Sequence, residues 1–161
     1  MNYPRHPLRF NVGFLISQPI GYSRDIHFEY PQVLLQEDLE LTDFKGVTRI
    51  SRTPQGILAQ CEFEGKTSAE CVRCLTEFAQ LLHTTFSELY AFDQRSTTET
   101  GLILPEDGNI DLEPLVREYL LIEFPISPLC REECKGLCSF CGQNLNEELC
   151  EHQYTSDVTE T

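Results

Sequence analysis

The chain is organised around Leu129–His152, which reads LCREECKGLCSFCGQNLNEELCEH. This stretch holds five of the eight cysteines and one of the four histidines, so any metal chemistry is expected here. Its centre is a C-x-x-C pair, Cys138 and Cys141, followed by Gly142. Two thiolates at this spacing meet at one ion only if the chain turns tightly, and glycine permits the positive φ of such a turn.

This stretch holds more potential ligands than the four that one tetrahedral zinc ion needs. Cys130 and Cys134 precede the C-x-x-C pair, and Cys150 and His152 follow it. Paired spacing is typical of structural zinc ligation, and nothing marks the chain as secreted. We therefore favour zinc over a disulfide cluster or a run of buried thiols. The C-x-x-C pair is the surest part of the site, and either flanking pair completes it.

Composition predicts a cytoplasmic protein with one ordinary domain and a small appended module. Residues 1–14 have no apolar run long enough for a signal peptide, and the sequence has no 18-residue apolar stretch, so we expect a soluble protein. The net charge of −14 is uneven, because residues 1–75 carry −1 and residues 76–161 carry −13. The acidic half disfavours nucleic acid and suits a basic partner such as a ribosomal protein. The ordinary alternative is a solvated surface.

Alternating apolar residues predict an α+β fold with an antiparallel β-meander of about six strands, curled or barrel-like. The expected strands lie at residues 8–16, 26–30, 39–50, 57–63, 67–71 and 78–92, with a turn inside the third. Pro31 is expected to stop the second strand. Glu64 and Gly65 are expected to form a tight hairpin connection.

One amphipathic helix, packed on the sheet, is predicted over residues 112–122. Asp111 is the expected N-cap, Pro114 lies in the first turn and Pro125 ends the helix. The predicted organisation is a β-rich domain at residues 1–127, a cysteine-rich zinc-binding module at 128–152 that closes one end, and a flexible acidic tail at 153–161.

A second C-x-x-C, Cys71 and Cys74, lies where the meander must turn. Three interpretations of this pair are open: a redox pair, half of a zinc site, or two structural thiols. A thioredoxin-like redox role would need a βαβ context, which the surrounding strands lack. Cys61 is expected to be an inward-facing apolar residue of its strand. If two zinc ions bind, the natural division assigns Cys138, Cys141, Cys150 and His152 to one and Cys71, Cys74, Cys130 and Cys134 to the other.

Three strings carry a resemblance to a known family: CVRCL, IDLEPLVREYLLIEFPISPLC and CKGLCSFCGQNLN. They are similar to the YceD family of bacterial and plastid proteins, also called large ribosomal RNA subunit accumulation proteins, which carry a domain of unknown function. The resemblance runs from about Leu8 to His152. It implies a role in large-subunit ribosomal RNA accumulation and ribosome assembly, without known enzymatic activity.

The resemblance also bears on the metal. Members with the C-terminal cysteines usually end in C-x-C, so His152 stands where a last cysteine is usual, and histidine also binds zinc. Some relatives keep only the first pair, which implies a stabilising role for the metal.

The expected function is therefore a non-enzymatic factor that binds a basic ribosomal protein or a pre-ribosomal particle, with no small-molecule substrate. Exposed helix glutamates such as Glu113 and Glu118 are expected to take part. One alternative is direct RNA binding through arginines of the less acidic half, lined along a strand face: Arg5, Arg9, Arg24, Arg49 and Arg52.

A second alternative is a zinc or thiol-redox enzyme, in which His152 acts with Glu148 or Glu151 beside a catalytic zinc. A catalytic zinc keeps an open coordination position. The surplus of thiolates favours a closed, structural site instead.

Overall fold

The computed structural model describes residues 3–154 and separates the chain into two compact units. The sheet unit comprises the chain up to Thr67 together with Leu81–Phe124. The cysteine unit comprises Ser68–Gln80 and the chain from Pro125 onward. The hairpin tip that carries the first C-x-x-C therefore groups with the cysteine-rich segment.

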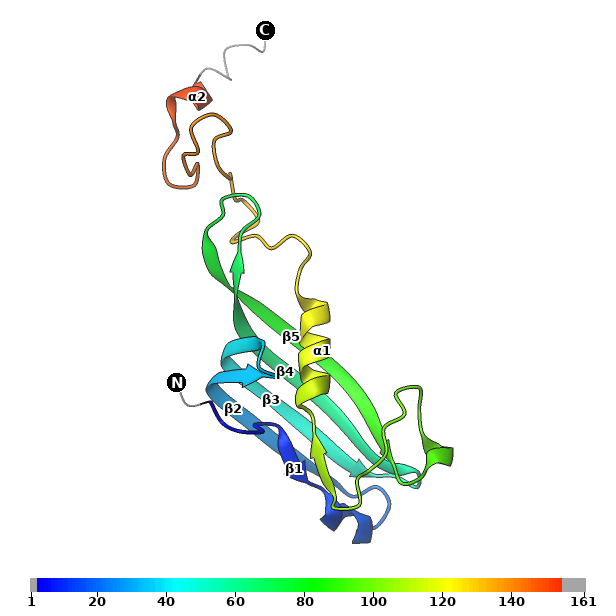
Figure 1. Cartoon of the computed structure of the whole chain (residues 1–161). Coiled ribbons are helices and arrows are strands. Elements are labelled where there is room, and N and C mark those ends of the chain that lie inside the picture. Colours follow the sequence, from blue (N-terminus) through cyan, green and yellow to red (C-terminus); the bar gives the residue numbers. More distant parts are fainter. Residues whose placement is uncertain (1–2, 155–161) are drawn as a thin grey trace. The chain divides into compact units, whose positions relative to one another are not determined.

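The sheet unit is built on an antiparallel meander whose spatial order follows the chain (Figure 1). Its strands are β2 (Ser23–Leu35), β3 (Leu39–Arg52), β4 (Gly56–Glu70) and β5 (Glu77–Ala91). In β3, Thr48 and Ile50 are fully buried, whereas Arg49 between them is exposed. This alternation means that one face of the sheet packs on a core and the other meets solvent.

Helix α1 (Glu113–Glu123) covers the inner face of this sheet, as Figure 1 shows. The short strands β1 (Arg9–Asn11) and β6 (Asn109–Asp111) pair antiparallel just before it and form a separate two-stranded sheet. Leu112, Val116 and Leu120 are fully buried, and their spacing of four residues places them on one face of the helix. Their burial fixes the side of α1 that meets the sheet.

Aromatic rings form the centre of the core. Phe44 and Phe63, on neighbouring strands, stack with their centroids 5.5 Å apart. Phe86 of β5 stacks on Tyr119 of α1 at 4.2 Å, and the Tyr119 hydroxyl donates to Glu88 Oε1 at 2.8 Å. Burying one such ring contributes about 2 kcal/mol. Stacking and a hydrogen bond therefore join the helix to the sheet.

The helix predicted over residues 112–122 is confirmed within one residue at each end. Leu112, not Asp111, takes the N-cap position, but Asp111 Oδ1 still accepts the Glu113 N–H at 3.0 Å. Pro114 lies in the first turn, where its missing N–H costs no helical hydrogen bond.

The predicted hairpin at Glu64 and Gly65 is wrong, because β4 runs through both residues. Gly65 lies against the Phe44 ring, and a Cβ there would be 3.3 Å from Phe44 Cδ2. The pairing of β3 with β4 shifts opposite this glycine, where Asp43 has a φ of 49°. The glycine therefore serves close packing at a β-bulge instead of a turn.

The predicted stop at Pro31 is also wrong, since β2 continues to Leu35. β2 is an edge strand, where a missing N–H need not remove a ladder hydrogen bond. The strand expected at residues 8–16 is limited to β1, and the chain then forms a 3-10 helix at Gly13–Ser17.

Antiparallel strands with a packed helix confirm the α+β class, but of the predicted curled or barrel-like forms the barrel-like one is wrong. The four-stranded sheet is open, with β2 and β5 as its edges. Its outer face carries charged side chains that water solvates, so only the inner face needs a cover. α1 supplies that cover.

No helix in residues 3–154 is long and apolar enough to cross a membrane. The tail predicted from residue 153 begins inside the short helix α2 (Glu151–Tyr154), and its remainder lies outside the described residues.

Candidate metal centres

The first pair of thiols lies in the turn between β4 and β5. The Leu75 N–H donates to the Cys71 carbonyl at 2.9 Å, and the Cys71 N–H donates to the Thr76 carbonyl at 3.0 Å. Leu75 has a φ of 61°, which reverses the chain after Cys74. The tight turn brings both thiols to one side, as the C-x-x-C spacing predicts.

The segment after α1 brings Cys130 and Cys134 to these two thiols. Cys71 Sγ lies 3.6 Å from Cys134 Sγ, and Cys74 Sγ lies 3.7 Å from Cys130 Sγ. All four are free thiols, at distances far beyond the ~2.05 Å of a disulfide. A tetrahedral zinc with Zn–S bonds of ~2.3 Å separates its sulfurs by about 3.8 Å. The spacing of this group therefore fits a four-thiolate zinc.

The pKa values of the first group indicate that its thiols cannot all ionise without a cation. Burial disfavours the Cys71 thiolate, but backbone N–H groups of Cys130, Cys74 and Arg73 outweigh it and lower the pKa to about 6. Burial and the neighbouring thiols raise the pKa of Cys130 to about 12. Four thiolates therefore cannot coexist here unless a positive charge balances them.

The second C-x-x-C forms a compact knuckle. The Gly142 N–H donates to Cys138 O at 2.9 Å, and the Cys138 N–H donates to Gln143 O at 2.8 Å. Gly142 has a φ of 77°, which confirms the predicted role of this glycine. Backbone N–H groups of Cys141 and Phe140 point at the Cys138 sulfur and lower its pKa to about 6. A sulfur so solvated by amides is a good metal ligand.

Cys150 and His152 complete the second group. The ligand atoms of Cys138, Cys141, Cys150 and His152 all lie within 4.8 Å of one another, as do those of the first group. Of the two pairings that the sequence left open, the structure brings the knuckle to Cys150 and His152. Three of the four residues in the first group are buried, whereas Cys141 and His152 are exposed. The two groups therefore differ in access to solvent.

The apolar core of the cysteine unit is small. It consists of three buried cysteines with a few packed neighbours: Cys71, Cys74 and Cys134, with Phe78, Leu129, Cys130 and Leu137. So little buried surface does not offset the conformational entropy of an ordered loop-rich segment. Cross-linking through metal ions fits this unit better than hydrophobic burial alone.

Asn146 is a supporting residue that sequence reasoning missed. Its Nδ2 donates to Cys134 Sγ at 3.3 Å, and its Oδ1 accepts the Lys135 N–H at 2.9 Å. A donor to a ligating sulfur fixes the orientation of that ligand. The repeat of asparagine at Asn144 and Asn146 was the only available hint, and no metal-ligand spacing includes it.

A third group, also missed, lies at the start of α1. Ligand atoms of His6, Asp111 and Glu113 lie within 4.8 Å of one another. Local roles already account for the carboxylates: Asp111 bonds the Glu113 N–H, and Glu113 Oε1 accepts the Gln36 N–H at 2.6 Å. Glu113 is 7% exposed, so the prediction that it lies on the exposed face of the helix is wrong.

Cys61 belongs to neither group. Its side chain is 4% exposed within the sheet core, which confirms the predicted inward-facing position. The Thr48 hydroxyl donates to its sulfur at 3.6 Å. Burial raises the pKa of Cys61 to about 11, so it remains a neutral thiol at neutral pH.

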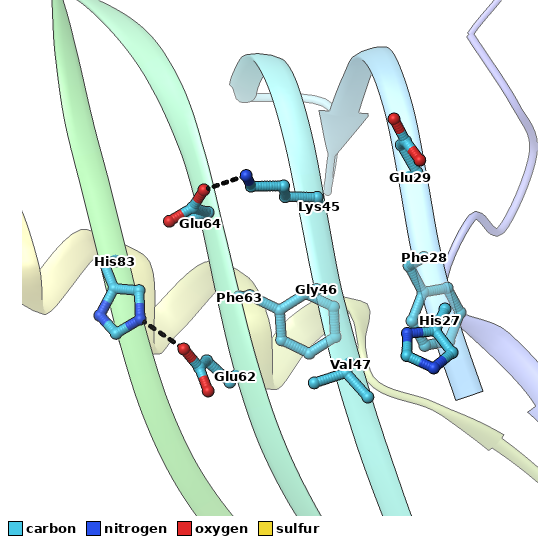
Figure 2. Close-up of a pocket in the computed structure, with 10 residues that line it drawn as sticks. All are labelled: His27, Phe28, Glu29, Lys45, Gly46, Val47, Glu62, Phe63, Glu64 and His83. Atoms are coloured by element: carbon cyan, nitrogen blue, oxygen red, sulfur yellow. Dashed lines mark hydrogen bonds and ion pairs between the residues drawn. The ribbon is translucent and has the colours of Figure 1, made fainter. Parts of the chain in front are cut away.

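The outer face of the sheet contains a shallow hollow of about 480 Å³, shown in Figure 2. His83 Nε2 lies 3.1 Å from Glu62 Oε1, and Lys45 Nζ lies 2.9 Å from Glu64 Oε1. His27 lines the side formed by β2, and α1 passes behind the sheet in this view. These two pairs lie beside the apolar side chains of Phe28, Val47 and Phe63, so the hollow is an open surface of mixed character.

The arginines of the N-terminal half do not share one strand face. Arg49 is exposed on the outer face, whereas Arg24 pairs with Ile50 and so lies on the inner side. The Arg52 guanidinium stacks over the Phe92 ring at 4.5 Å. The continuous basic strip that the RNA-binding alternative requires is therefore not formed by these residues.

Comparison with known proteins relates the chain to one family. The profile described as Large ribosomal RNA subunit accumulation protein YceD matches residues 59–159. An uncharacterized protein of Mycobacterium leprae is 34% identical over 103 residues, which cover 60% of this chain and 46% of that protein. A protein of Mycobacterium tuberculosis is 33% identical over 106 residues, which cover 62% of this chain and 50% of that protein.

A plastid relative carries a functional name. The Large ribosomal RNA subunit accumulation protein YCED homolog 1, chloroplastic, of Arabidopsis thaliana is 38% identical over 47 residues, which cover 29% of this chain and 15% of that protein. The chain spans about half the length of the mycobacterial relatives. No solved structure matches it.

Proposed function

We propose a function from one premise: the chain belongs to the YceD family, the large ribosomal RNA subunit accumulation proteins. In this proposal it is a non-enzymatic cytoplasmic factor that supports accumulation of the large-subunit ribosomal RNA during ribosome assembly. The observation that carries the proposal is the family match over residues 59–159, which includes α1 and every cysteine of the chain.

The metal in this proposal is structural zinc, with one ion in each four-ligand group. Cys71, Cys74, Cys130 and Cys134 would hold one ion, and Cys138, Cys141, Cys150 and His152 the other. Four protein ligands leave no open position for a substrate, which is the arrangement of structural zinc sites. The role of the ions is to cross-link a unit with little core of its own.

The proposed partner is a basic ribosomal protein, alone or on an early large-subunit particle. The cysteine unit carries nine Asp/Glu against three Lys/Arg, and the sheet unit carries 17 against nine. Both units are therefore acidic, and such a surface attracts basic proteins while it repels the phosphates of bare RNA. Separation of the arginines weighs further against direct RNA binding.

The test is recovery of partners from a cell lysate with and without nuclease, followed by a salt titration. We expect ribosomal proteins to remain bound after nuclease and to be released as salt rises, because exposed charges are screened beyond ~8 Å at physiological ionic strength. If nuclease abolishes recovery and the purified chain binds bare RNA tightly, the RNA-binding alternative is correct.

Two charge variants show which unit makes the contact. Glu118→Gln with Glu123→Gln neutralises the exposed side of α1, and Glu147→Gln with Glu148→Gln neutralises exposed acids of the cysteine unit. We expect each pair to leave the fold intact, because none of the four side chains is buried. Weaker recovery with either pair identifies the unit that meets the partner.

A further inference from the structure

Phe140 differs from every other phenylalanine of the chain. All ten lie within residues 3–154; nine are buried or half-buried, and Phe140 is 79% exposed. Exposure of a large apolar ring to water costs more free energy than exposure of a small side chain does. The other phenylalanine of this unit, Phe78, packs on its core. The exposed ring of Phe140 is therefore accessible to a partner.

The ring is held in place by the knuckle. Phe140 lies between Cys138 and Cys141, and its backbone N–H points at the Cys138 sulfur. Its ring stacks on the His152 ring, with centroids 5.3 Å apart and planes 20° apart. An aromatic side chain fixed by its own backbone loses little conformational entropy when a partner binds.

Exposed glutamates lie close in the chain to Cys150 and His152, the two ligands that meet the knuckle. Glu151 precedes His152 at the start of α2, and Glu147 and Glu148 lie in the turn after Asn144, whose carbonyl accepts both N–H groups. All three glutamates are exposed. An aromatic face with carboxylates nearby attracts a cationic side chain through cation–π and charge interactions. The same carboxylates repel phosphate, so a stacked nucleotide is disfavoured.

We propose that Phe140, together with Glu147, Glu148 and Glu151, forms the surface that receives an arginine or lysine of a basic protein segment. This inference rests on the proposed function, because it names the part of the cysteine unit that meets the ribosomal partner. Loss of the ring should weaken the contact about 2- to 30-fold, the range expected for cation–π pairs from exposed to desolvated sites.

The direct test uses the zinc-loaded full chain and a synthetic arginine-rich peptide, with single-stranded poly(U) RNA as the competing probe. Phe140→Ala should weaken peptide binding, and Phe140→Trp should restore it, because tryptophan is the best cation–π acceptor. Ile126→Ala is the matched control: Ile126 is fully exposed in the same unit and has no π-face. Zinc content verifies that each variant keeps its fold.

The outcomes are distinct. Equal peptide affinity of Phe140→Ala and the parent chain, or no peptide binding by the parent, overturns the inference. A loss confined to poly(U) binding would assign the ring to RNA and also overturn it. In the lysate experiment, equal recovery of ribosomal proteins by the parent and Phe140→Ala rejects this surface alone. Failure of the parent chain to recover them rejects the proposed function.

Discussion

At the scale of single residues, the surroundings of a thiol decide its role. Cys61 is enclosed by the sheet core, and burial raises its pKa to about 11. Cys138 receives backbone N–H groups from Cys141 and Phe140, which lower its pKa to about 6. The first thiol is chemically inert at neutral pH and serves packing. The second is largely ionised and suited to a cation.

Thiol reactivity at pH 7 should separate Cys61 from the other seven cysteines. Chelator treatment should unfold the cysteine unit, which holds seven of the thiols, and leave the sheet unit folded. We therefore expect rapid alkylation of those seven thiols and slow alkylation of Cys61, because a buried neutral thiol is a poor nucleophile. Intact-mass spectrometry counts the adducts. Cys61→Ala should leave the number of fast adducts unchanged, and denaturant should expose the eighth thiol in the parent chain. An eighth fast adduct without denaturant would contradict this assignment.

The Tyr119–Glu88 hydrogen bond should contribute measurably to stability. Glu88 is 5% exposed and accepts from Tyr119 and from Thr100 Oγ1 at 3.0 Å. Tyr119→Phe removes a donor from a buried carboxylate, which costs about 1–3 kcal/mol of unfolding free energy. Urea denaturation measures the change. Tyr22→Phe, at an exposed tyrosine, should change the midpoint little, and equal effects of the two changes would reject this role for Tyr119.

At the scale of elements, the sequence predicted those helices and strands that depend on local sequence patterns. The period of α1 and the Thr-, Phe- and Leu-rich run of β5 were readable because each depends on neighbours along the chain. Gly65 was misread as a turn, since only the Phe44 ring on the next strand explains it. Spacing likewise identified pairs of metal ligands but not how they combine, because that depends on contacts between the β4–β5 turn and the segment after α1.

Packing between β3 and β4 gives a sharp test of the core. Gly46 pairs with Phe63, and a Cβ at Gly46 would lie 2.2 Å from Phe63 Cδ1 and 2.6 Å from Glu62 O. Gly46→Ala therefore forces the ring or the strand to move, and we expect a loss of about 1–3 kcal/mol in unfolding free energy. Chemical denaturation followed by circular dichroism provides the measurement.

The neighbouring residue supplies the control for this change. Val47 lies on the outer, solvent-facing side of β3 and is only half-buried. Val47→Ala should cost clearly less than Gly46→Ala. If both variants unfold at the same denaturant concentration as the parent chain, the close approach of β4 to Gly46 is not part of the folded state.

At the scale of the whole molecule, two kinds of stabilisation hold the two units. The sheet unit has a continuous apolar core that includes Phe44, Phe63 and Leu120. The cysteine unit has a few packed residues around three buried thiols. Hydrophobic burial therefore suffices for the first, whereas the second depends on its ligand groups. Loss of metal should then unfold one unit and spare the other.

Single-ligand variants should reveal this division. A structural zinc contributes ~10 kcal/mol or more to local folding, so removal of one thiolate releases the ion and disorders the segment that it holds. We expect the parent chain to contain two zinc ions under reducing conditions. Cys138→Ser should retain one, in the group at the β4–β5 turn, and Cys71→Ser should lose at least that ion. Elemental analysis measures the zinc per chain, with Cys61→Ala as the control that keeps both ions.

Hydrogen exchange then shows which parts of the chain lose structure in these variants. In Cys138→Ser we expect fast exchange of the amides of residue 138, Gly142 and Leu145, which are hydrogen-bonded in the knuckle of the parent chain. Protection of β3 and β4 in the sheet unit should be unchanged. Protection of the sheet amides holds because their core contains no metal ligand. Full zinc retention in Cys138→Ser and in Cys141→Ser would reject the ligand assignment. Loss of sheet protection together with the zinc would show instead that the two units fold as one.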